Sequence, residues 1–300
     1  MIQMLKSIPE IFKMMINARK WCEKQESNDS IDIIVLWKKY EELRSPEQRA
    51  FRVLFWSLLF YAGGLLIIYQ LGEVNVPYRG GLAIYIDKLV VIWFSLPLFV
   101  LLLFGVVDEI RLCVGWIYQL VDDKASWSKQ CYDVLRKKHA QIDDNNLLRD
   151  WLVIDIIAKR TDTVGQRIYY PFVVLFILLL SQSRFFDNWD MSIGLLVMIF
   201  ISSLYAIASA FILRRAAEDA RETVISRMTG KFVTARNEQY VLPKGKKMSP
   251  AKQIKLLIEE VRNVHEGAFS SWHQQPVVKA FLWIFSGGGL ILFQYLKLGY

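Results

Sequence analysis

Residues that usually carry catalysis or bind metals are scarce in this sequence. Its 300 residues include only three cysteines and three histidines. The cysteines form no CxxC pair and are odd in number, so a disulfide framework is not expected and a reducing compartment suits them. Cys131 and His139 are eight residues apart, as are His265 and His273, and this spacing matches no common metal-ligand pattern. We therefore expect no metal site.

The motifs of common nucleotide-binding and hydrolytic enzymes are also absent. The chain contains no GxGxxG, HExxH or GxSxG sequence. A phosphate-binding GxxxxGK[ST] loop around Gly245 would need glycine at position 240 and Ser or Thr at 247, where the chain has Tyr240 and Lys247. We therefore expect no bound cofactor.

Charged side chains are missing from four stretches of the chain. Three of these stretches hold 19 to 23 residues, and the fourth holds 13. Since an α-helix rises about 1.5 Å per residue, the longer stretches can cross a hydrocarbon core of about 30 Å. The short one is followed by aromatic residues typical of a membrane interface, to which its helix can extend. The stretches predicted to span a membrane are Val53 to Leu71, Leu89 to Val107, Tyr169 to Ser181 and Met191 to Leu213.

A fifth apolar block, Val277 to Leu296, follows Gln275-Pro276 and contains a single charge, Lys279. The block is long enough to span a membrane. Its three consecutive glycines, residues 287–289, weaken a helix in water but allow close helix contact in lipid. We interpret it as a fifth spanning helix, the alternative being a re-entrant or surface-lying helix.

Helix start and break signals flank the apolar blocks. Ser45-Pro46-Glu47-Gln48 and Thr163-Val164-Gly165-Gln166 match capping boxes, which are predicted to begin the first and third spanning helices. Gly72 to Asp87 is predicted to be a polar turn, and Pro97 predicts a kink in the second span.

The fourth apolar stretch ends at Arg214 and Arg215, but the helical pattern continues. Residues 216–228 contain only good or neutral helix formers and neither Gly nor Pro, so one long helix is predicted to leave the membrane. Residues 146–160 predict a further helix outside it. The expected fold class is all-α: a polytopic membrane helix bundle of four to five transmembrane helices with cytoplasmic helical extensions.

Basic residues are distributed unevenly between the apolar blocks. Of the 37 lysines and arginines, 32 lie in segments 1–52, 108–168 and 214–276, and three lie in the turns 72–88 and 182–190. By the positive-inside rule the three basic segments are cytoplasmic. We therefore expect an integral protein of the bacterial inner membrane with a cytoplasmic N-terminus, for which the lipid bilayer is the first partner.

This orientation divides the chain into six segments that alternate between cytoplasm and membrane. They are a cytoplasmic N-terminal helical region at 1–52, a first transmembrane hairpin at 53–107, a cytoplasmic helical loop at 108–167, a second transmembrane hairpin at 168–213, a cytoplasmic helical extension at 214–276, and the fifth transmembrane or re-entrant helix at 277–300.

Acidic residues offer the only candidates for chemistry at the membrane boundary. Asp108 and Glu109 follow the second apolar stretch directly. They are either the first hydrated residues past the bilayer or an acidic ring at the cytoplasmic mouth of an oligomeric pore. Asp155 lies within an apolar run, and is either a buried acid or a charge on the wet side of an interfacial helix.

Small and apolar residues form a continuous face along the long helix. Their spacing of three or four residues keeps them on one side across the membrane boundary. The first three positions form a small-xxx-small surface that lets another backbone approach closely. This helix-packing seam, which is predicted to contact either the chain's own helices or a second subunit, consists of Ser202, Ala206, Ala210, Leu213, Ala217, Ala220 and Val224.

A basic loop contains Lys244, Lys246 and Lys247. In a soluble protein such a loop would be a candidate for nucleic-acid binding. Close to a bilayer in the sequence, it is predicted either to contact anionic lipid headgroups or merely to contribute to the topology, and no nucleic-acid partner is expected.

Three functional hypotheses fit these features. The favoured one is a non-enzymatic membrane assembly or signal-transducing component, whose spanning bundle is coupled to a cytoplasmic helical region and which forms a homo-oligomer or binds a membrane or cytoplasmic protein. The second is a pore-forming or membrane-perturbing effector, including an ion channel. The third is a membrane enzyme with an unrecognised acidic site around Asp108, Glu109 and Asp155.

Overall fold

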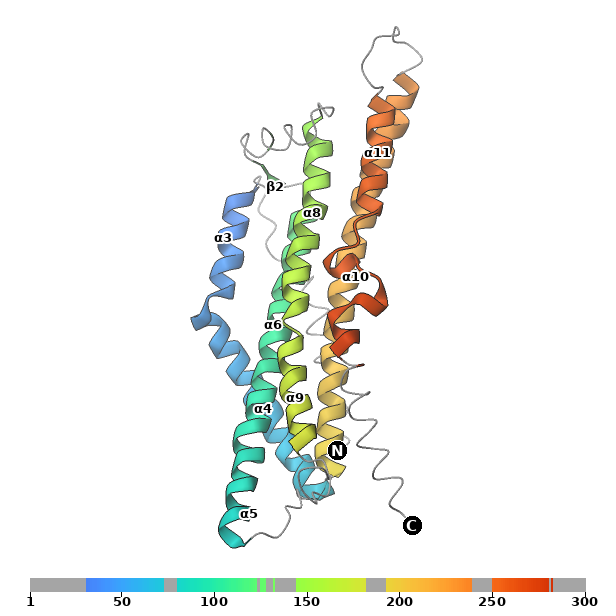
Figure 1. Ribbon diagram of the computed structural model, residues 1–300. Coiled ribbons are helices and arrows are strands. Elements are labelled where there is room, and N and C mark those ends of the chain that lie inside the picture. The colour runs from blue at the N-terminus through green and yellow to red at the C-terminus, as the bar shows by residue number, and fades with distance from the viewer. Residues whose placement is uncertain are drawn as a thin grey trace, which may run out of the picture. The chain divides into compact units, whose positions relative to one another are not determined.

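The computed structural model of the protein describes residues 31–72, 80–122, 125–127, 132, 144–181, 193–238, 250–280 and 282 (Figure 1). These residues are overwhelmingly helical, which confirms the predicted all-α class. The main helices are α3 (Ile33–Arg44), α4 (Pro46–Leu71), α5 (Gly81–Lys88), α6 (Leu96–Val121), α8 (Asn145–Gln166), α9 (Tyr169–Ser181), α10 (Ile193–Glu238) and α11 (Pro250–Arg262).

Shorter elements connect some of these helices. A π-helix, η1 (Leu89–Ser95), joins α5 to α6, and two 3-10 helices, η3 (Gly267–Phe269) and η4 (Trp272–Gln274), follow α11. Two two-residue strands, β1 (Ile31–Asp32) and β2 (Ala125–Ser126), pair in parallel. Their register places Ile31 opposite Ala125 and Asp32 opposite Ser126.

Within the described residues, four helical stretches are long and apolar enough to cross a membrane. This number agrees with the four uncharged stretches of the sequence. The predicted fifth spanning segment, 277–300, lies largely outside the described residues. The four stretches are Pro46–Leu71, Gly81–Val121, Asn145–Ser181 and Ile193–Arg236.

The chain divides into two compact units, which we describe separately. Helices α3, α6, α8 and α10 contribute residues to both. Unit 1 comprises Met1–Leu43, Arg111–Thr163 and Ile212–Ser270, and unit 2 comprises Arg44–Ile110, Val164–Phe211 and Ser271–Tyr300.

In unit 2, α4 and α10 approach each other at two glycines. A Cβ built on Gly194 would lie 2.7 Å from Cα of Ile68, so only glycine fits at this backbone contact. Gly64 of α4 instead faces the end of the Met198 side chain, which occupies the space that a Cβ would need. Glycine at a helix crossing lets backbones come together without a side chain between them, as in membrane helix pairs generally.

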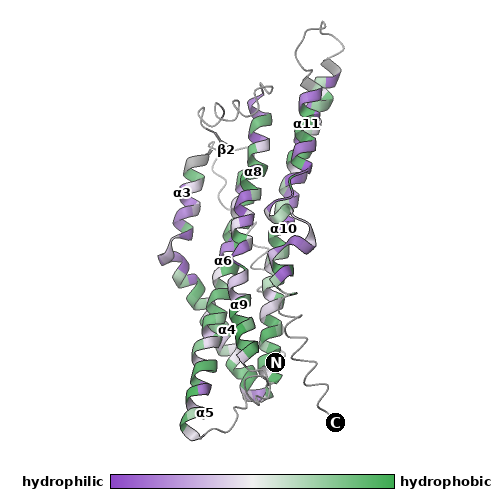
Figure 2. Cartoon of the chain, viewed as in Figure 1, coloured by the Kyte–Doolittle hydropathy of each residue, from purple (hydrophilic) through white to green (hydrophobic). Residues whose placement is uncertain are grey.

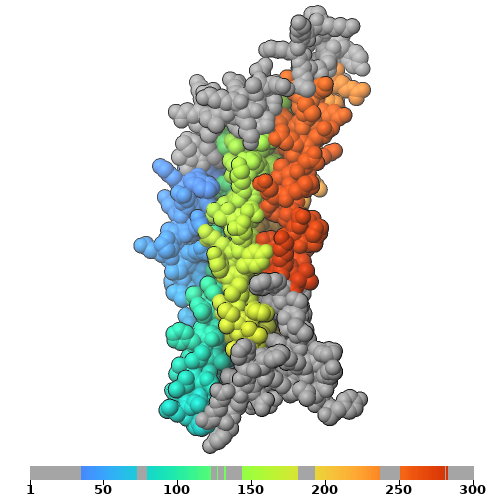
Figure 3. Space-filling view, in the orientation of Figure 1, coloured from blue at the N-terminus to red at the C-terminus, as the bar shows by residue number. Residues whose placement is uncertain are grey.

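The apolar side chains of unit 2 face both inward and outward. On α6, Leu96, Val100 and Leu103 are buried, whereas on α4 Phe51 and Phe55 are strongly exposed. Segment 81–95, drawn in teal, is likewise exposed at the surface in Figure 3, and Figure 2 colours most of it as hydrophobic. Exposing so much apolar surface to water would cost much free energy, whereas contact with the hydrocarbon of a bilayer has no such cost.

The N-terminal signals of the helices are only partly as expected. Helix α4 begins at Pro46 as predicted, but Ser45 caps it without a side-chain hydrogen bond. The second capping box is wrong, because Thr163 lies inside α8 and its hydroxyl donates to the carbonyl of Lys159, 3.1 Å away. A threonine hydroxyl that bonds back to the i−4 carbonyl cannot cap a new helix.

Two further expectations about the second span need adjustment. The turn predicted for 72–87 is shorter, since α5 is already helical from Gly81. Pro97 is the second residue of α6, directly after the π-helix η1. Because proline lacks an N–H and crowds the i−4 carbonyl, it disturbs the preceding turn, and the disturbance here coincides with π-helical geometry.

In unit 1, the segment after α11 is fastened to α8 and α10. The backbone N–H of Ala268 donates to the Thr161 hydroxyl at 2.9 Å, and Arg221 donates to the carbonyl of Val264 at 2.7 Å. Gly267 has a φ of 58°, and a Cβ there would meet the carbonyl of Ala158. Helix α11 itself is amphipathic, with Ile254 and the other apolar residues of one face buried.

We expect Gly194→Ala to lower the stability of the protein by about 1–3 kcal/mol, because the new methyl group overpacks a backbone contact that cannot yield. Gly230 lies on the same helix with nothing within 4 Å of a built Cβ. Gly230→Ala should therefore stabilise by up to about 1 kcal/mol through helix propensity. Thermal unfolding in detergent measures both changes, and equal shifts for the two variants would refute the predicted close contact.

Candidate functional site

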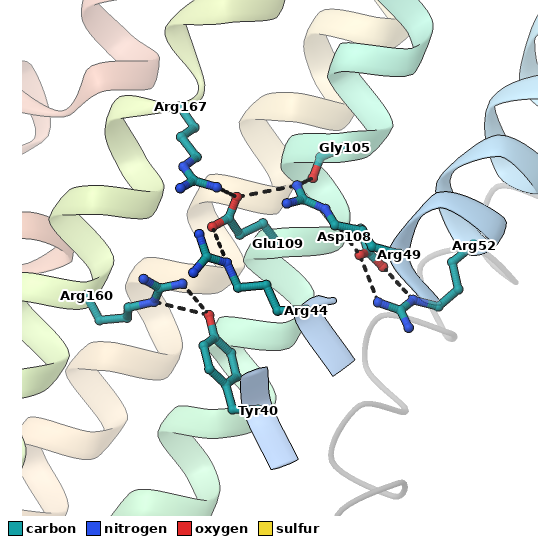
Figure 4. A network of polar contacts seen from close by, with 9 residues as sticks. All are labelled: Tyr40, Arg44, Arg49, Arg52, Gly105, Asp108, Glu109, Arg160 and Arg167. Atoms are coloured by element: carbon teal, nitrogen blue, oxygen red, sulfur yellow. Dashed lines mark hydrogen bonds and ion pairs between the residues drawn. The ribbon is translucent and has the colours of Figure 1, made fainter. Parts of the chain in front are cut away.

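Two carboxylates and four arginines form a polar cluster in unit 2 (Figure 4). We call it the arginine–carboxylate cluster. It draws on the end of α3, the first turns of α4, the middle of α6 and the turn between α8 and α9. Its members are Arg44, Arg49, Arg52, Asp108, Glu109 and Arg167.

The sequence brings these residues together because each borders an apolar stretch. Arg52 directly precedes the first stretch, Asp108 directly follows the second, and Arg167 precedes Ile168 at the start of the third apolar helix. Helices that cross the same bilayer place their boundary residues at a similar depth. The charges at the ends of three apolar stretches can therefore meet.

Glu109 is the most deeply buried member of the cluster. Its side chain is 1% exposed and accepts a 2.6 Å hydrogen bond from Nη1 of Arg167. Nη2 of Arg49 lies 3.4 Å from the same oxygen, and Nε of Arg44 lies 3.5 Å from the other one. Figure 4 shows the three arginines converging on this one carboxylate.

Asp108 forms a separate, forked pair with Arg52. Nε and Nη2 of Arg52 each donate to one carboxylate oxygen at 3.1 Å. Arg49 links the two halves of the cluster, since its Nε lies 3.9 Å from Asp108 while its Nη2 contacts Glu109 and donates to the carbonyl of Gly105. Planar, bidentate arginine pairs of this kind are strong and geometrically specific.

The charges of the cluster explain why a carboxylate can be buried at this position. An isolated ionised carboxylate loses several kcal/mol of hydration free energy in a protein interior, roughly, unless cations and hydrogen bonds replace the water. Three arginines supply that replacement for Glu109. The four arginines and two carboxylates leave the cluster with a formal excess of positive charge.

A second buried carboxylate, Asp150, lies in unit 1, outside the four uncharged stretches of the sequence. Its side chain is 1% exposed, and it pairs with Arg149 at 3.2 Å and with Arg227 at 3.7 Å. Desolvation raises the pKa of Asp150 and outweighs the lowering by Arg149, Arg227 and Lys231. This group ties α8 to the polar part of α10 within unit 1.

Figure 4 also shows a contact internal to unit 1, between Arg160 and Tyr40. Nε and Nη2 of Arg160 donate to the tyrosine hydroxyl at 3.1 and 2.8 Å. The Tyr40 ring packs against Trp37 and Trp116, with centroids 5.7 and 5.6 Å away. An aromatic group thereby joins α3 to α6.

The acidic candidates from the sequence fall into different surroundings. Asp108 and Glu109 are paired with arginines of the same chain, and their role as a pore-mouth ring stays a prediction. Asp155 is partly exposed and pairs with Lys159, 2.7 Å away in the next turn, which argues against a buried acid. Among the described residues, no group of three or more His, Cys, Asp or Glu side chains is placed to hold a metal ion.

The seven residues of the helix-packing seam are all buried. Ser202, Ala217 and Val224 are completely inaccessible, and the others are at most 8% exposed. The burial agrees with packing on the chain's own helices, and the seam's role in helix packing stays a prediction. The lipid-contact candidates Lys244, Lys246 and Lys247 lie outside the described residues.

Sequence reasoning identified the two carboxylates of the cluster but missed their partners. Arg44, Arg49, Arg52 and Arg167 were counted only as basic residues that orient the chain. A usable signal was present, because an acidic pair at one membrane boundary needs compensation from cations at the neighbouring boundaries. Comparisons with protein-family models, curated proteins and solved structures find no match.

We expect Glu109→Gln to lower stability by about 2–3 kcal/mol, because it removes the charged acceptor shared by three arginines. Combining it with Arg167→Gln should cost less than the sum of the single changes, since the two groups interact directly. Asp155→Asn is the control, with an expected effect under about 0.5 kcal/mol for an exposed pair.

Chemical or thermal unfolding of the four variants in one detergent measures this double-mutant cycle. Additive effects of Glu109→Gln and Arg167→Gln would contradict the pairing.

Proposed function

We propose that the protein is a multi-pass integral membrane protein that acts as an assembly or signal-transducing component rather than as an enzyme. In this proposal the spanning helices are mechanically coupled to a cytoplasmic helical region. The four helices long and apolar enough to cross a membrane support the location of the protein.

The observation that carries the proposal is the continuity of α10. This helix runs without a break for 46 residues, Ile193–Glu238, from an uncharged half into a highly charged half. A helix with no proline, glycine pair or π-bulge at the transition bends little there. A tilt or rotation imposed on one half of α10 would therefore reach the other half.

The seam supports the same proposal, because both halves of α10 are packed along one line. Ser202, Ala206 and Ala210 are buried in unit 2, and Ala217 and Ala220 are buried in unit 1. Small residues permit close packing with few interlocking side chains. A partner that shifts the helices touching one half of the seam would displace the other half as well. That partner would be a second copy of the chain or another membrane or cytoplasmic protein.

The pairing of Asp108 and Glu109 favours this function over a pore with an acidic mouth. A carboxylate ring selects cations through an unbalanced negative field. Here the two carboxylates are surrounded by four arginines, so the local charge has the opposite sign.

Coupling along α10 predicts different effects for two identical substitutions. Ala206 is buried, whereas Ala208 is partly exposed and lies about 200° away around the helix. In nanodiscs, Ala206→Leu should speed hydrogen exchange in peptides from 214–238, because overpacking the membrane half disturbs the packing of the charged half. Ala208→Leu should leave these peptides unchanged.

Exchange rates of all α10 peptides, measured by mass spectrometry, decide the question. If Ala206→Leu lowers the melting temperature but leaves exchange in 214–238 at the wild-type rate, the two halves are not coupled.

The proposed orientation places the N-terminus and the basic segments in the cytoplasm of a bacterial cell, with the protein in the inner membrane. A single cysteine introduced at Asn188 should then react with a membrane-impermeant thiol reagent applied to spheroplasts, because this turn faces the periplasm. One at Lys246 should react only after lysis. The matching background is a variant with Cys22, Cys113 and Cys131 replaced by serine, and the reverse labelling pattern would overturn the orientation.

A further inference from the structure

We propose that the arginine–carboxylate cluster binds the headgroup of an anionic glycerophospholipid whose acyl chains lie along the exposed face of α4. The proposal uses the membrane location of the protein. It does not depend on the coupling along α10. It concerns a different site from the basic loop at residues 244–247.

The first argument is charge. Glu109 and Asp108 neutralise two of the four arginines, so the cluster keeps a formal charge of +2. At the edge of a low-dielectric layer an unbalanced charge attracts counter-ions strongly. A phosphodiester, with its single negative charge, would reduce the excess, and the fork of an arginine side chain matches the geometry of its oxygens.

The second argument is the donors that remain available. In the described residues Nε of Arg44 lies 3.5 Å from Glu109, and Nη1 of Arg167 lies 2.6 Å from it. The other nitrogens of these two guanidinium groups can donate to a ligand. Their side chains are 30% and 34% exposed, so a headgroup can reach them without unfolding the cluster.

The third argument is the apolar surface that begins beside the charges. Phe55 and Leu59 follow Arg52 by three and seven residues, which places them on its side of α4. These two side chains are 55% and 57% exposed, and Phe51, next to Arg52, is 76% exposed. The exposed apolar face of α4 thus begins at Arg52, a member of the cluster, and offers a surface for the acyl chains of a lipid bound there.

These features commit the site to a lipid rather than to a free anion. Inorganic phosphate would satisfy the charge but would leave the adjoining apolar face unused. A zwitterionic lipid would cover that face but would not reduce the positive excess. Only a lipid with net negative charge matches both halves of the surface.

The test uses the full chain purified in detergent and titrated with dioleoyl phosphatidylglycerol, with bound lipid counted by native mass spectrometry. We expect this lipid to bind at least about tenfold more tightly than dioleoyl phosphatidylcholine. A factor of about ten in affinity corresponds to one charge-assisted hydrogen bond. Inorganic phosphate is added as a competitor. Displacement of the lipid by phosphate at equal concentration would show a free-anion site and overturn the proposal.

Two charge-removing variants make the test specific for the cluster. Arg44→Gln leaves Glu109 with two arginines and should weaken phosphatidylglycerol binding about tenfold. Arg215→Gln removes the same charge from an exposed arginine that follows another apolar stretch, and it should bind as the wild type does. Equal losses in the two variants would show non-specific attraction and refute the site.

A third variant guards against a folding defect. Arg44→Lys keeps the charge but loses the planar fork, so its affinity should fall between those of the wild type and Arg44→Gln. The melting temperature of each variant without lipid shows whether it is folded. For each folded variant, the loss of affinity for phosphatidylglycerol is compared with the loss for phosphatidylcholine. Equal losses for the two lipids would show that the headgroup is not recognised, and the proposal would be wrong.

Discussion

Glu109 stands at the end of an apolar run, yet it points into the interior of unit 2, where a carboxylate is unstable by itself. Arg44, Arg49 and Arg167 make its burial tolerable, and each comes from a different helix or connection. The packing of these segments in unit 2 thus depends on the neutralisation of one charge. The neighbouring forked pair between Arg52 and Asp108 is a second ion pair that links α4 to α6. Hydrophobic contact also holds these helices together, and the ion pairs add a specific alignment, since each arginine must reach its carboxylate.

Close backbone contact and charge pairing restrict unit 2 in complementary ways. The contact of Gly194 with Ile68 limits how far apart α4 and α10 can lie, because any side chain at that position would separate them. The charge cluster fixes how α4 and α6 are aligned along their axes. Unit 1 uses a comparable combination, in which Asp150 is buried between Arg149 and Arg227 while the alanines of α10 allow close approach. In both units a buried acid therefore specifies alignment, and small residues specify distance.

Periodicity and the absence of charge were sufficient to predict most of the fold. The uncharged stretches identified the four candidate spans, and the absence of helix breakers in 216–228 predicted the long α10. The spacing of small residues predicted a face that the structure shows to be buried. Local capping signals were less reliable, since Thr163 forms an i−4 hydrogen bond that the motif does not distinguish from a cap. Of the candidate site, the sequence predicted the two carboxylates but not the arginines that pair with them. Each arginine of the cluster is far from Glu109 in the sequence, and only the packing of the helices determines which charges meet.

The serine within the membrane part of the seam has a consequence for motion. The Ser202 hydroxyl donates to the carbonyl of Met198 in its own helix, 2.7 Å away. Its hydrogen-bond donor is therefore satisfied without a neighbouring helix. Ala206 and Ala210 have no polar side-chain group at all. Along this part of α10 no directional bond from these three side chains needs to break when the helix moves along its axis. This face therefore packs by van der Waals contact alone, without a hydrogen bond from these three side chains that would tie α10 to one axial position.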